Sequence, residues 1–423
     1  MLIKMTAFVH FILALIFLPF SLTAPLLPRE WDHVPTIAPS HDPWYKDEPA
    51  NLSGYSPGET IAYRAVAIPS YFNTSFSPNR VAQAWQVKYR TTDSRYNPTW
   101  AITTLYVPTQ RDNDAVLLSY QQPYDSSNIN RSPSYLAVTV DPSKDTTYAF
   151  ALPWILNTNP GWFINMPDYE GPKASFSSGA ISGQATLDSI RAVRQLSRQT
   201  GMSASIPFVM WGYSGGALAT EWAAELQGSY APGLTDLAVC ALVGGLTPNL
   251  TNVFYTITEK NTSSAFIIPD AIEGLSTQFP ELKQPVVSVL GRSSWGDVLA
   301  YVRGLVAAQD LGGLKSFIDR LLSVDDVKRV LSNDAVMGMH GVPLMDMYVY
   351  EASYDQVSPV QDTRKLVDRY CGLRGKVHYE EFTNPAVDHV GMGGRGLFYG
   401  LDLLDKVLKG RKLQECVKLT NAS

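Results

Sequence analysis

The chain has 423 residues, of which 45% are hydrophobic and 17% charged, so it is long enough to bury a large core. Its formal net charge is −5 and no run of basic residues stands out, which argues against nucleic acid as a partner. No Cys/His group has the spacing of metal ligands and no HExxH motif occurs, so we expect neither a metal nor another cofactor.

The chain begins MLIKMTAFVHFILALIFLPFSLTAP, in which Lys4 precedes an apolar stretch from about Ala7 to Phe20. This pattern predicts a secretory signal peptide over residues 1–24, with cleavage near Ala24. A membrane anchor is the alternative, but the apolar run is short for a span. We therefore expect a soluble, secreted protein. Six N-x-Ser/Thr sequons agree with this route and are candidates for N-glycosylation: Asn51, Asn73, Asn130, Asn249, Asn261 and Asn421.

Three cysteines are present in the sequence. Cys371 and Cys416 both lie in the C-terminal part and could form one disulfide in an oxidising compartment. Cys240 lies within an apolar stretch and is expected to be a buried strand residue with a free thiol.

Residues 25–58 are rich in Pro, Asp and Trp and are expected to form an irregular N-terminal arm. Strands and helices then alternate, which favours a mostly parallel sheet with helices on both faces. The expected strands are 84–92, 101–108, 115–122, 207–212, 237–245, 342–352 and 376–382, and the expected helices are 182–197, 215–227 and 395–410.

One block, residues 248–341, is helical in pattern and contains no good strand. It separates a first part of the core, residues 25–247, from a second part, residues 342–423. An insertion between two core strands would sit over the carboxyl edge of the sheet, where ligands bind in such folds. We interpret the block as a cap that controls which substrate reaches the site. The alternative is an additional packed layer without that role.

The sequence GYSGG, residues 212–216, places Ser214 among glycines, after an apolar strand and before a helix rich in Ala, Glu and Leu. A strand, turn and helix in this order form a nucleophile elbow, whose sharp turn exposes the serine hydroxyl at the edge of the sheet. Gly212 and Gly216 stand where larger side chains would collide. We therefore interpret Ser214 as a nucleophile and not as part of a simple tight turn.

A serine nucleophile needs a base and an orienting acid, which follow it in the order Asp/Glu, then His. His389 follows the last expected strand, in a loop from which it could reach over the sheet edge. Asp355 directly follows the strand 342–352 and is the predicted acid. Glu351 is the second choice, since it would still lie within the strand, and Asp388 adjoins His389 too closely to orient it.

The developing oxyanion needs N–H donors. The backbone N–H of Gly215, directly after the nucleophile, is the expected first donor. The second should come from the loop around SYQQPYDSSN, residues 119–128, but the sequence pattern does not select a residue within it.

At these motifs the chain resembles the fungal secretory lipase family, the lipase A type of α/β-hydrolase, over nearly all of the mature chain. The resemblance implies an α/β-hydrolase fold with a helical cap and a triad of Ser214, Asp355 and His389. It also implies that Asp125 is the second oxyanion donor. The segments that carry it are DPWYKDEPANLSGYSPGETIAYR, LLSYQQPYDSS, MPDYEGPKASFSSG, GYSGGA, YDQVSP and the DH pair at 388–389.

The sequence thus predicts a secreted serine ester hydrolase, a lipase or carboxylesterase, that forms an acyl-enzyme on a small-molecule or lipid ester. Transient contact with a lipid interface and the oligomeric state are left open. Members of the resembled family also include deacetylases of acetylated secondary metabolites, such as trichothecene C-3 esterases, and the triad does not separate these activities. A serine peptidase and a catalytically inactive binding protein on the same scaffold are the remaining alternatives.

Overall fold

The structure of the chain is a computed structural model that describes residues 37–69, 80–110, 115–139, 146–159, 161–260 and 263–421. The expected signal peptide, residues 1–24, and the sequons at Asn73 and Asn261 lie outside the described residues. Within the described part, no helix is both long and apolar enough to cross a membrane.

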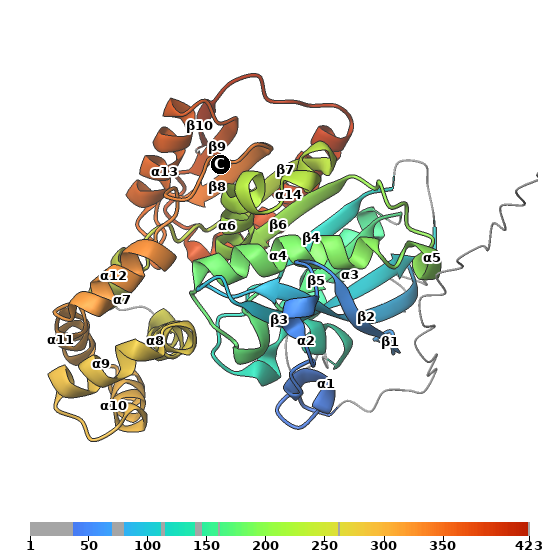
Figure 1. Cartoon of the computed structure of the whole chain (residues 1–423). Helices are drawn as coiled ribbons and strands as arrows, with labels where there is room; N and C mark the ends of the chain where they lie inside the picture. The colour runs from blue at the N-terminus through green and yellow to red at the C-terminus, as the bar shows by residue number, and fades with distance from the viewer. Residues whose placement is uncertain are drawn as a thin grey trace, which may run out of the picture.

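A ten-stranded sheet runs through the molecule in the order β1-β2-β3-β5-β4-β6-β7-β8-β9-β10 (Figure 1). The strands β1, β2, β3 and β5 pair antiparallel, and every pair from β5 onward is parallel. The strands are β1 Thr60–Val66, β2 Val81–Thr92, β3 Pro98–Pro108, β4 Leu117–Gln121, β5 Phe163–Pro167, β6 Phe208–Tyr213, β7 Ala238–Gly244, β8 Asp346–Ala352, β9 Val377–Phe382 and β10 Val417–Asn421.

The expected mostly parallel sheet is therefore confirmed, and each expected strand is present. Three strands were not expected from the sequence: β1, β5 and β10. β1 is half-buried along its whole length and β10 is largely exposed, so neither shows the alternation of buried and exposed residues that marks a strand. β5 is only a short buried run.

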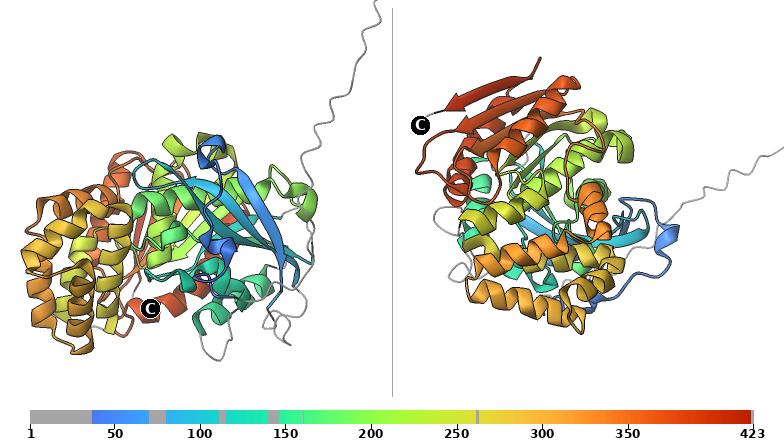
Figure 2. Two further views of the ribbon diagram at one scale, coloured as in Figure 1. Left: turned by 60° about the horizontal axis from the view of Figure 1, so that its bottom comes forward. Right: turned by 90° about the vertical axis from the view of Figure 1, so that its left-hand side faces the viewer.

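Helices cover both faces of the sheet (Figures 1 and 2). Helices α4, α6 and α13 pack on one face, and α2, α3 and α14 pack on the other. The helices are α1 Pro43–Lys46, α2 Pro133–Thr139, α3 Thr146–Thr158, α4 Gly179–Arg194, α5 Ser197–Thr200, α6 Gly215–Tyr230, α7 Leu250–Lys260, α8 Ile267–Gln278, α9 Lys283–Leu290, α10 Trp295–Ala307, α11 Leu311–Leu321, α12 Asp325–Asp334, α13 Val360–Gly372 and α14 His389–Leu408.

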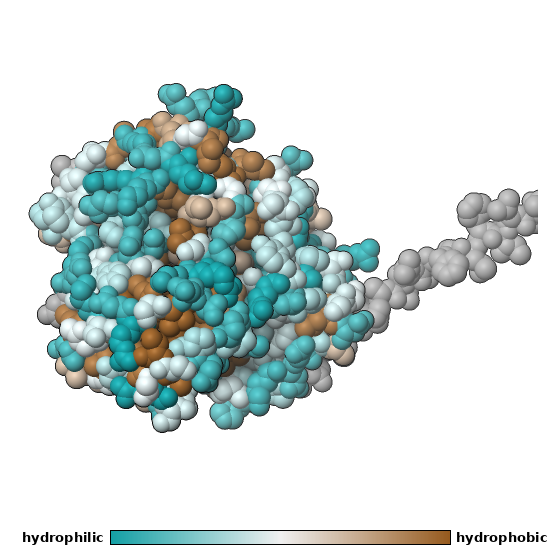
Figure 3. Space-filling view, turned by 60° about the vertical axis from the view of Figure 1, so that its left-hand side comes forward, coloured by the Kyte–Doolittle hydropathy of each residue, from teal (hydrophilic) through white to brown (hydrophobic). Residues whose placement is uncertain are grey.

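Helices α7 to α12 form a separate block beside the sheet, with an apolar core of its own (Figures 1 and 2). The block contacts the main core at several places, two of them on loops that follow core strands. The Lys260 ammonium at the end of α7 donates to the backbone carbonyl of Asp355, and the Ser126 hydroxyl donates to Asp270 on α8 over 3.3 Å. On the face shown in Figure 3, apolar residues are exposed in patches among polar ones.

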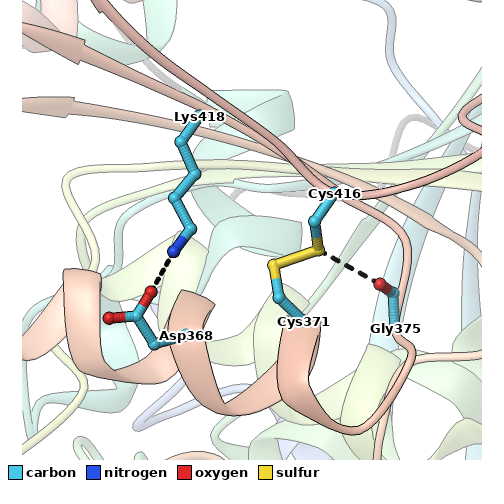
Figure 4. The surroundings of a disulfide bond; sticks show 5 residues. All are labelled: Asp368, Cys371, Gly375, Cys416 and Lys418. Atoms are coloured by element: carbon cyan, nitrogen blue, oxygen red, sulfur yellow. Dashed lines mark hydrogen bonds and ion pairs between the residues drawn. A yellow bond between two sulfur atoms is a disulfide. The ribbon is translucent and has the colours of Figure 1, made fainter.

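The C-terminal strand β10 is bound to the rest of the chain by several interactions. It pairs in parallel with β9, and Cys416, just before β10, forms a disulfide with Cys371 near the end of α13 (Figure 4). Lys418 on β10 also forms an ion pair with Asp368 on α13. The expected disulfide is thus confirmed, and Cys240 is buried with a free thiol, also as expected.

Candidate active site

Four of the residues singled out in the sequence follow four parallel strands of the sheet. Asp125 follows β4, Ser214 follows β6, Asp355 follows β8 and His389 follows β9. Because parallel strands run in one direction, the segments after them emerge at one edge of the sheet, where ligands bind in open α/β folds. The four residues, which are far apart in the sequence, therefore lie at the same edge of the sheet.

Ser214 stands in a strained turn between β6 and α6. Its φ of 54° and ψ of −121° are a backbone conformation that residues other than glycine seldom adopt. The turn needs glycine on both sides. A Cβ on Gly212 would lie 2.1 Å from the carbonyl oxygen of Gly216, and a Cβ on Gly216 would lie 1.9 Å from that of Gln121. The glycines at positions 212 and 216 therefore permit the tight elbow that carries Ser214.

Ser214, His389 and Asp355 form a continuous hydrogen-bonded chain. The Oγ of Ser214 lies 2.8 Å from Nε2 of His389, and Nδ1 of His389 lies 2.5 Å from Oδ2 of Asp355. The second oxygen of Asp355, Oδ1, accepts from the backbone N–H groups of Val357 and Ser358, each over 2.7 Å. The carboxylate is thereby held in one orientation, with one oxygen directed to the imidazole.

The opposite charges of Asp355 and His389 shift the pKa values of both groups. Burial would raise the pKa of Asp355, but the charge and hydrogen bond of His389, together with the backbone N–H donors, bring the pKa below its usual range. Burial would likewise lower the pKa of His389, but the charge and hydrogen bond of Asp355 raise it above the ordinary value. The lowered pKa favours the ionised form of Asp355, and the raised pKa makes the imidazole of His389 a stronger base than that of a free histidine.

One expectation about His389 was wrong, because we expected this residue to lie in a loop. His389 is the first residue of α14, and Asp388 is the N-cap whose side chain accepts from the N–H of Gly391 over 2.8 Å. The backbone of His389 is held on both sides. Its N–H donates to Oε1 of Gln356 over 2.8 Å, and its carbonyl accepts from the hydroxyl of Tyr213 over 2.5 Å.

Asp125 and Gly215 lie beside the serine. Gly215 opens α6, so its N–H has no partner within the helix. The two residues are in close contact: a Cβ on Gly215 would lie only 2.1 Å from Oδ1 of Asp125. Asp125 has a φ of 49°, and burial raises the pKa of its carboxyl to about 6, although the charges of His389 and Arg131 oppose this rise.

The serine opens into a cavity of about 590 Å³, within the range of small-molecule sites. Four aromatic residues on the strands and their ends line it: Tyr120, Trp211, Tyr213 and Tyr350. Their positions follow the alternation of strand residues, because Trp211 and Tyr213 are two residues apart on β6 and so face the same side of the sheet. We did not expect this aromatic wall from the sequence, although the alternation of strand residues could have indicated it.

Helix α14 forms another wall of the cavity, through Val390, Gly393, Gly394 and Leu397. Ala151 on α3 also lines the cavity. Every described residue that lines it lies outside residues 248–341, so its walls come from α3, α14 and the ends of the strands.

Glu351, the second choice for the acid, and two further histidines have other partners. Glu351 is buried on β8, where its Oε2 accepts from the N–H of Leu246 over 3.0 Å. His340 lies 3.4 Å from Glu225, and His378 on β9 lies 3.5 Å from Glu380. None of these three contacts involves Ser214.

The fold and the arrangement of serine, histidine and aspartate at the carboxyl edge of its sheet define an α/β-hydrolase. The model of the secretory lipase family matches residues 149–393. The trichothecene C-3 esterase of Fusarium sporotrichioides is 36% identical, over 82% of this chain and 79% of that protein. Lipase 6 of Candida albicans is 31% identical, over 79% of this chain and 74% of that protein. The chain belongs to the secretory lipase family and is a carboxylic ester hydrolase.

Among solved structures, Candida antarctica lipase A in its closed state has the same fold, with a TM-score of 0.75 and 24% identity, over 90% of each chain. The α/β-hydrolase fold that the sequence predicted is thus confirmed. This likeness concerns the architecture alone.

Proposed function

We propose that Ser214, His389 and Asp355 hydrolyse carboxylic esters through an acyl-enzyme intermediate. The observation that carries this proposal is the unbroken hydrogen-bonded chain, with 2.8 Å from Ser214 to His389 and 2.5 Å from His389 to Asp355. The raised pKa of His389, which results from the charge of Asp355 overcoming the effect of burial, suits the imidazole to act as a base.

In the first half of the reaction Oγ of Ser214 attacks the ester carbonyl while Nε2 of His389 takes its proton. The carboxylate of Asp355 stabilises the imidazolium that forms. The N–H groups of Gly215 and Asp125 donate to the oxyanion, and the alcohol leaves with the proton from His389. In the second half water attacks the acyl group, His389 again accepts a proton and returns it to Ser214, and the acid is released.

The replacement Ser214→Ala tests this mechanism. We expect hydrolysis of p-nitrophenyl butyrate to fall by a factor of about 10⁴ or more, because only substrate binding and the oxyanion donors remain. Labelling by a small fluorophosphonate should also be lost. Ser203→Ala is the matched control, since Ser203 is exposed and precedes β6 at the opposite end from Ser214. Retention of more than a few per cent of activity in folded Ser214→Ala protein would exclude Ser214 as the nucleophile.

Two substrate classes fit the site. A lipase or short-chain carboxylesterase is the first, supported by the apolar cavity and by the similarity to Lipase 6. A deacetylase of an acetylated secondary metabolite is the second, and the 36% identity to a trichothecene C-3 esterase favours it. A panel of esters that differ in acyl length and in the bulk of the alcohol separates the two.

We also propose that residues 248–341 act as a cap on the site. The bond from Lys260 to the carbonyl of Asp355 and the bond from Ser126 to Asp270 support this role, since both join the block to loops that carry site residues. Because the described cavity walls lie outside the block, we expect the block to act by positioning these loops.

Secretion of the protein remains part of the proposal. The family name, the Cys371–Cys416 disulfide and the sequons support it. Asn51 is exposed, whereas Asn130, Asn249 and Asn421 are half-buried. Asn249 also accepts, through Oδ1, from the N–H of Thr251 over 3.0 Å, so Asn51 is the most accessible described sequon. A loss of mass after treatment with a peptide N-glycosidase would identify the modified asparagines.

A further inference from the structure

One polar side chain in the cavity is not used by the proposed mechanism. Gln122 directly follows β4, is 1% exposed and lines the cavity beside Ser214. Neither its Nε2 nor its Oε1 has a hydrogen-bond partner among the described residues. Its neighbour differs in this respect. Gln121 donates through Nε2 to the Ser119 hydroxyl over 2.7 Å, and its Oε1 accepts from the Thr220 hydroxyl over 2.8 Å.

The backbone of Gln122 is fixed next to the nucleophile elbow. Its carbonyl accepts from the hydroxyl of Tyr169 over 2.9 Å. A Cβ on Gly216 would lie 3.4 Å from the carbonyl carbon of Gln122, so the chain here runs against the start of α6. The backbone of Gln122 is therefore held against the start of α6, and this residue lines the same cavity as Ser214.

A buried amide without a partner destabilises the folded chain, so such groups in native proteins are usually satisfied or have a functional reason to be unpaired. The amide of Gln122 can both donate and accept a hydrogen bond. A plain hydrocarbon chain in the cavity would leave both of these capacities unused. A ligand with an oxygen atom at this position would use them.

We propose that the cavity binds a ring-containing part of the ester that carries a hydroxyl or carbonyl oxygen, and that Gln122 hydrogen-bonds this oxygen. Tyr120, Trp211 and Tyr350 give the cavity an aromatic lining against which the ring can pack, and Gln122 supplies the polar contact. This inference rests on the proposed ester hydrolysis at Ser214 and makes Gln122 a residue that determines specificity. The ring-containing part could be the acid or the alcohol of the ester.

Two pairs of esters test the inference and separate these sources. Cyclohexyl acetate and trans-2-hydroxycyclohexyl acetate differ on the alcohol side. Methyl cyclohexanecarboxylate and its trans-2-hydroxy derivative differ on the acid side. Each kcat/KM is divided by the rate of alkaline hydrolysis of the same ester. We expect the wild-type enzyme to favour the hydroxylated member of one pair by about 10- to 100-fold, because a site built to bind a hydroxyl discriminates against analogues without it.

In Gln122→Leu this preference should fall to about twofold or less, and Gln122→Met, which keeps an unbranched chain, should behave in the same way. Gln184→Leu is the matched control. Gln184 on α4 is also buried, its amide also has no partner among the described residues, and it does not line the cavity, so its variant should keep the wild-type preference.

Wild-type enzyme that cleaves p-nitrophenyl acetate but shows no preference within either pair would overturn the inference while leaving the proposed function intact. A preference that survives in both Gln122 variants would also overturn it. Wild-type enzyme that neither cleaves p-nitrophenyl acetate nor reacts with a fluorophosphonate would instead refute the proposed function.

Discussion

The charges around His389 determine at which pH the imidazole can act. Asp355 contributes the largest of the charge effects that raise the pKa of His389, Asp125 comes next, and Asp388 follows. Asp355 lies in the hydrogen-bonded chain, but Asp125 can be neutralised without breaking it. The φ of 49° at Asp125 also suits asparagine, which tolerates this region better than most residues.

We therefore expect Asp125→Asn to move the acid limb of the kcat/KM profile to lower pH, by less than one unit. Removing a negative neighbour destabilises the imidazolium, so His389 loses its proton at a lower pH and the active base persists further into acid. The profile is measured with p-nitrophenyl butyrate from pH 4 to pH 9. Asp388→Asn, which keeps a good N-cap residue, should give a smaller shift in the same direction. An acid limb that stays in place or moves upward in Asp125→Asn would contradict this account.

The sequence could reveal some of these residues and not others. Ser214 and Asp355 were predictable because each directly follows a recognisable strand, and an elbow has a fixed glycine pattern. Asp125 was indicated only by the family resemblance, since nothing in its loop distinguishes it from its neighbours. Gln122 could not be found, because the absence of a partner for its amide is a property of the folded surroundings.

The start of helix α14 was predicted incorrectly from the sequence, although the helix itself was expected. We expected it at residues 395–410, but it begins at His389. The discrepancy arises because four of the first eight residues of the helix are glycine, and glycine is a poor helix former. These glycines allow close packing. A Cβ on Gly396 would lie 2.3 Å from the Tyr350 ring, and a Cβ on Gly400 would lie 2.4 Å from the Trp211 ring.

Gly394 is the exception on this helix, and it provides a test of the cavity wall. It lines the cavity, and no atom lies within 4 Å of the position its Cβ would take. We expect Gly394→Leu to fold and to narrow the cavity, lowering the kcat/KM for a bulky ester relative to that for p-nitrophenyl acetate by about tenfold or more. The ratio is measured with cyclohexyl acetate as the bulky ester.

Gly304→Leu is the matched control for this experiment, since Gly304 lies on α10, has equally open space and does not line the cavity. A change in the ratio for Gly304→Leu but not for Gly394→Leu would mean that the helical block forms the functional wall.

At the scale of the whole molecule, several buried carboxyl groups have raised pKa values, so they keep a proton at pH values at which a free carboxyl has lost it. Burial raises the pKa of both Asp168 and Asp334 to about 7, although the hydrogen bonds that they accept oppose the rise. Asp334 at the end of α12 accepts from the N–H of Ala180 and from the hydroxyl of Ser94, each over 3.0 Å, and so joins the helical block to the core.

These groups make stability depend on pH. Between about pH 4 and pH 7 the folded state binds more protons than the unfolded state, so the free energy of unfolding falls as the pH rises. We expect a loss of about 2 kcal/mol per group between pH 5 and pH 8, and a Tm lower by several degrees at pH 8. The raised pKa of His389 acts in the same direction, and the lowered pKa of buried His378 opposes it.

Thermal unfolding at both pH values provides the measurement. Asp334→Asn should show a smaller difference in Tm than the wild-type protein, whereas Asp319→Asn, which changes an exposed residue on α11, should not. Equal Tm values for wild-type protein at pH 5 and pH 8 would show that these carboxyl groups are ionised in the folded state.

The way in which β10 is held has a consequence for making the protein. The Cys371–Cys416 bond closes a loop across 45 positions and stabilises the fold by about 2–4 kcal/mol. Without it, β10 is held by its pairing with β9, by the hydrogen bond from Asn421 to Glu380 and by the exposed ion pair of Lys418. If β10 detaches, the largely buried strand β9 becomes the edge of the sheet, and an uncovered edge is a template for intermolecular pairing and aggregation. A host cell that keeps these thiols reduced should therefore yield insoluble aggregates, even though every residue around Ser214 is unchanged.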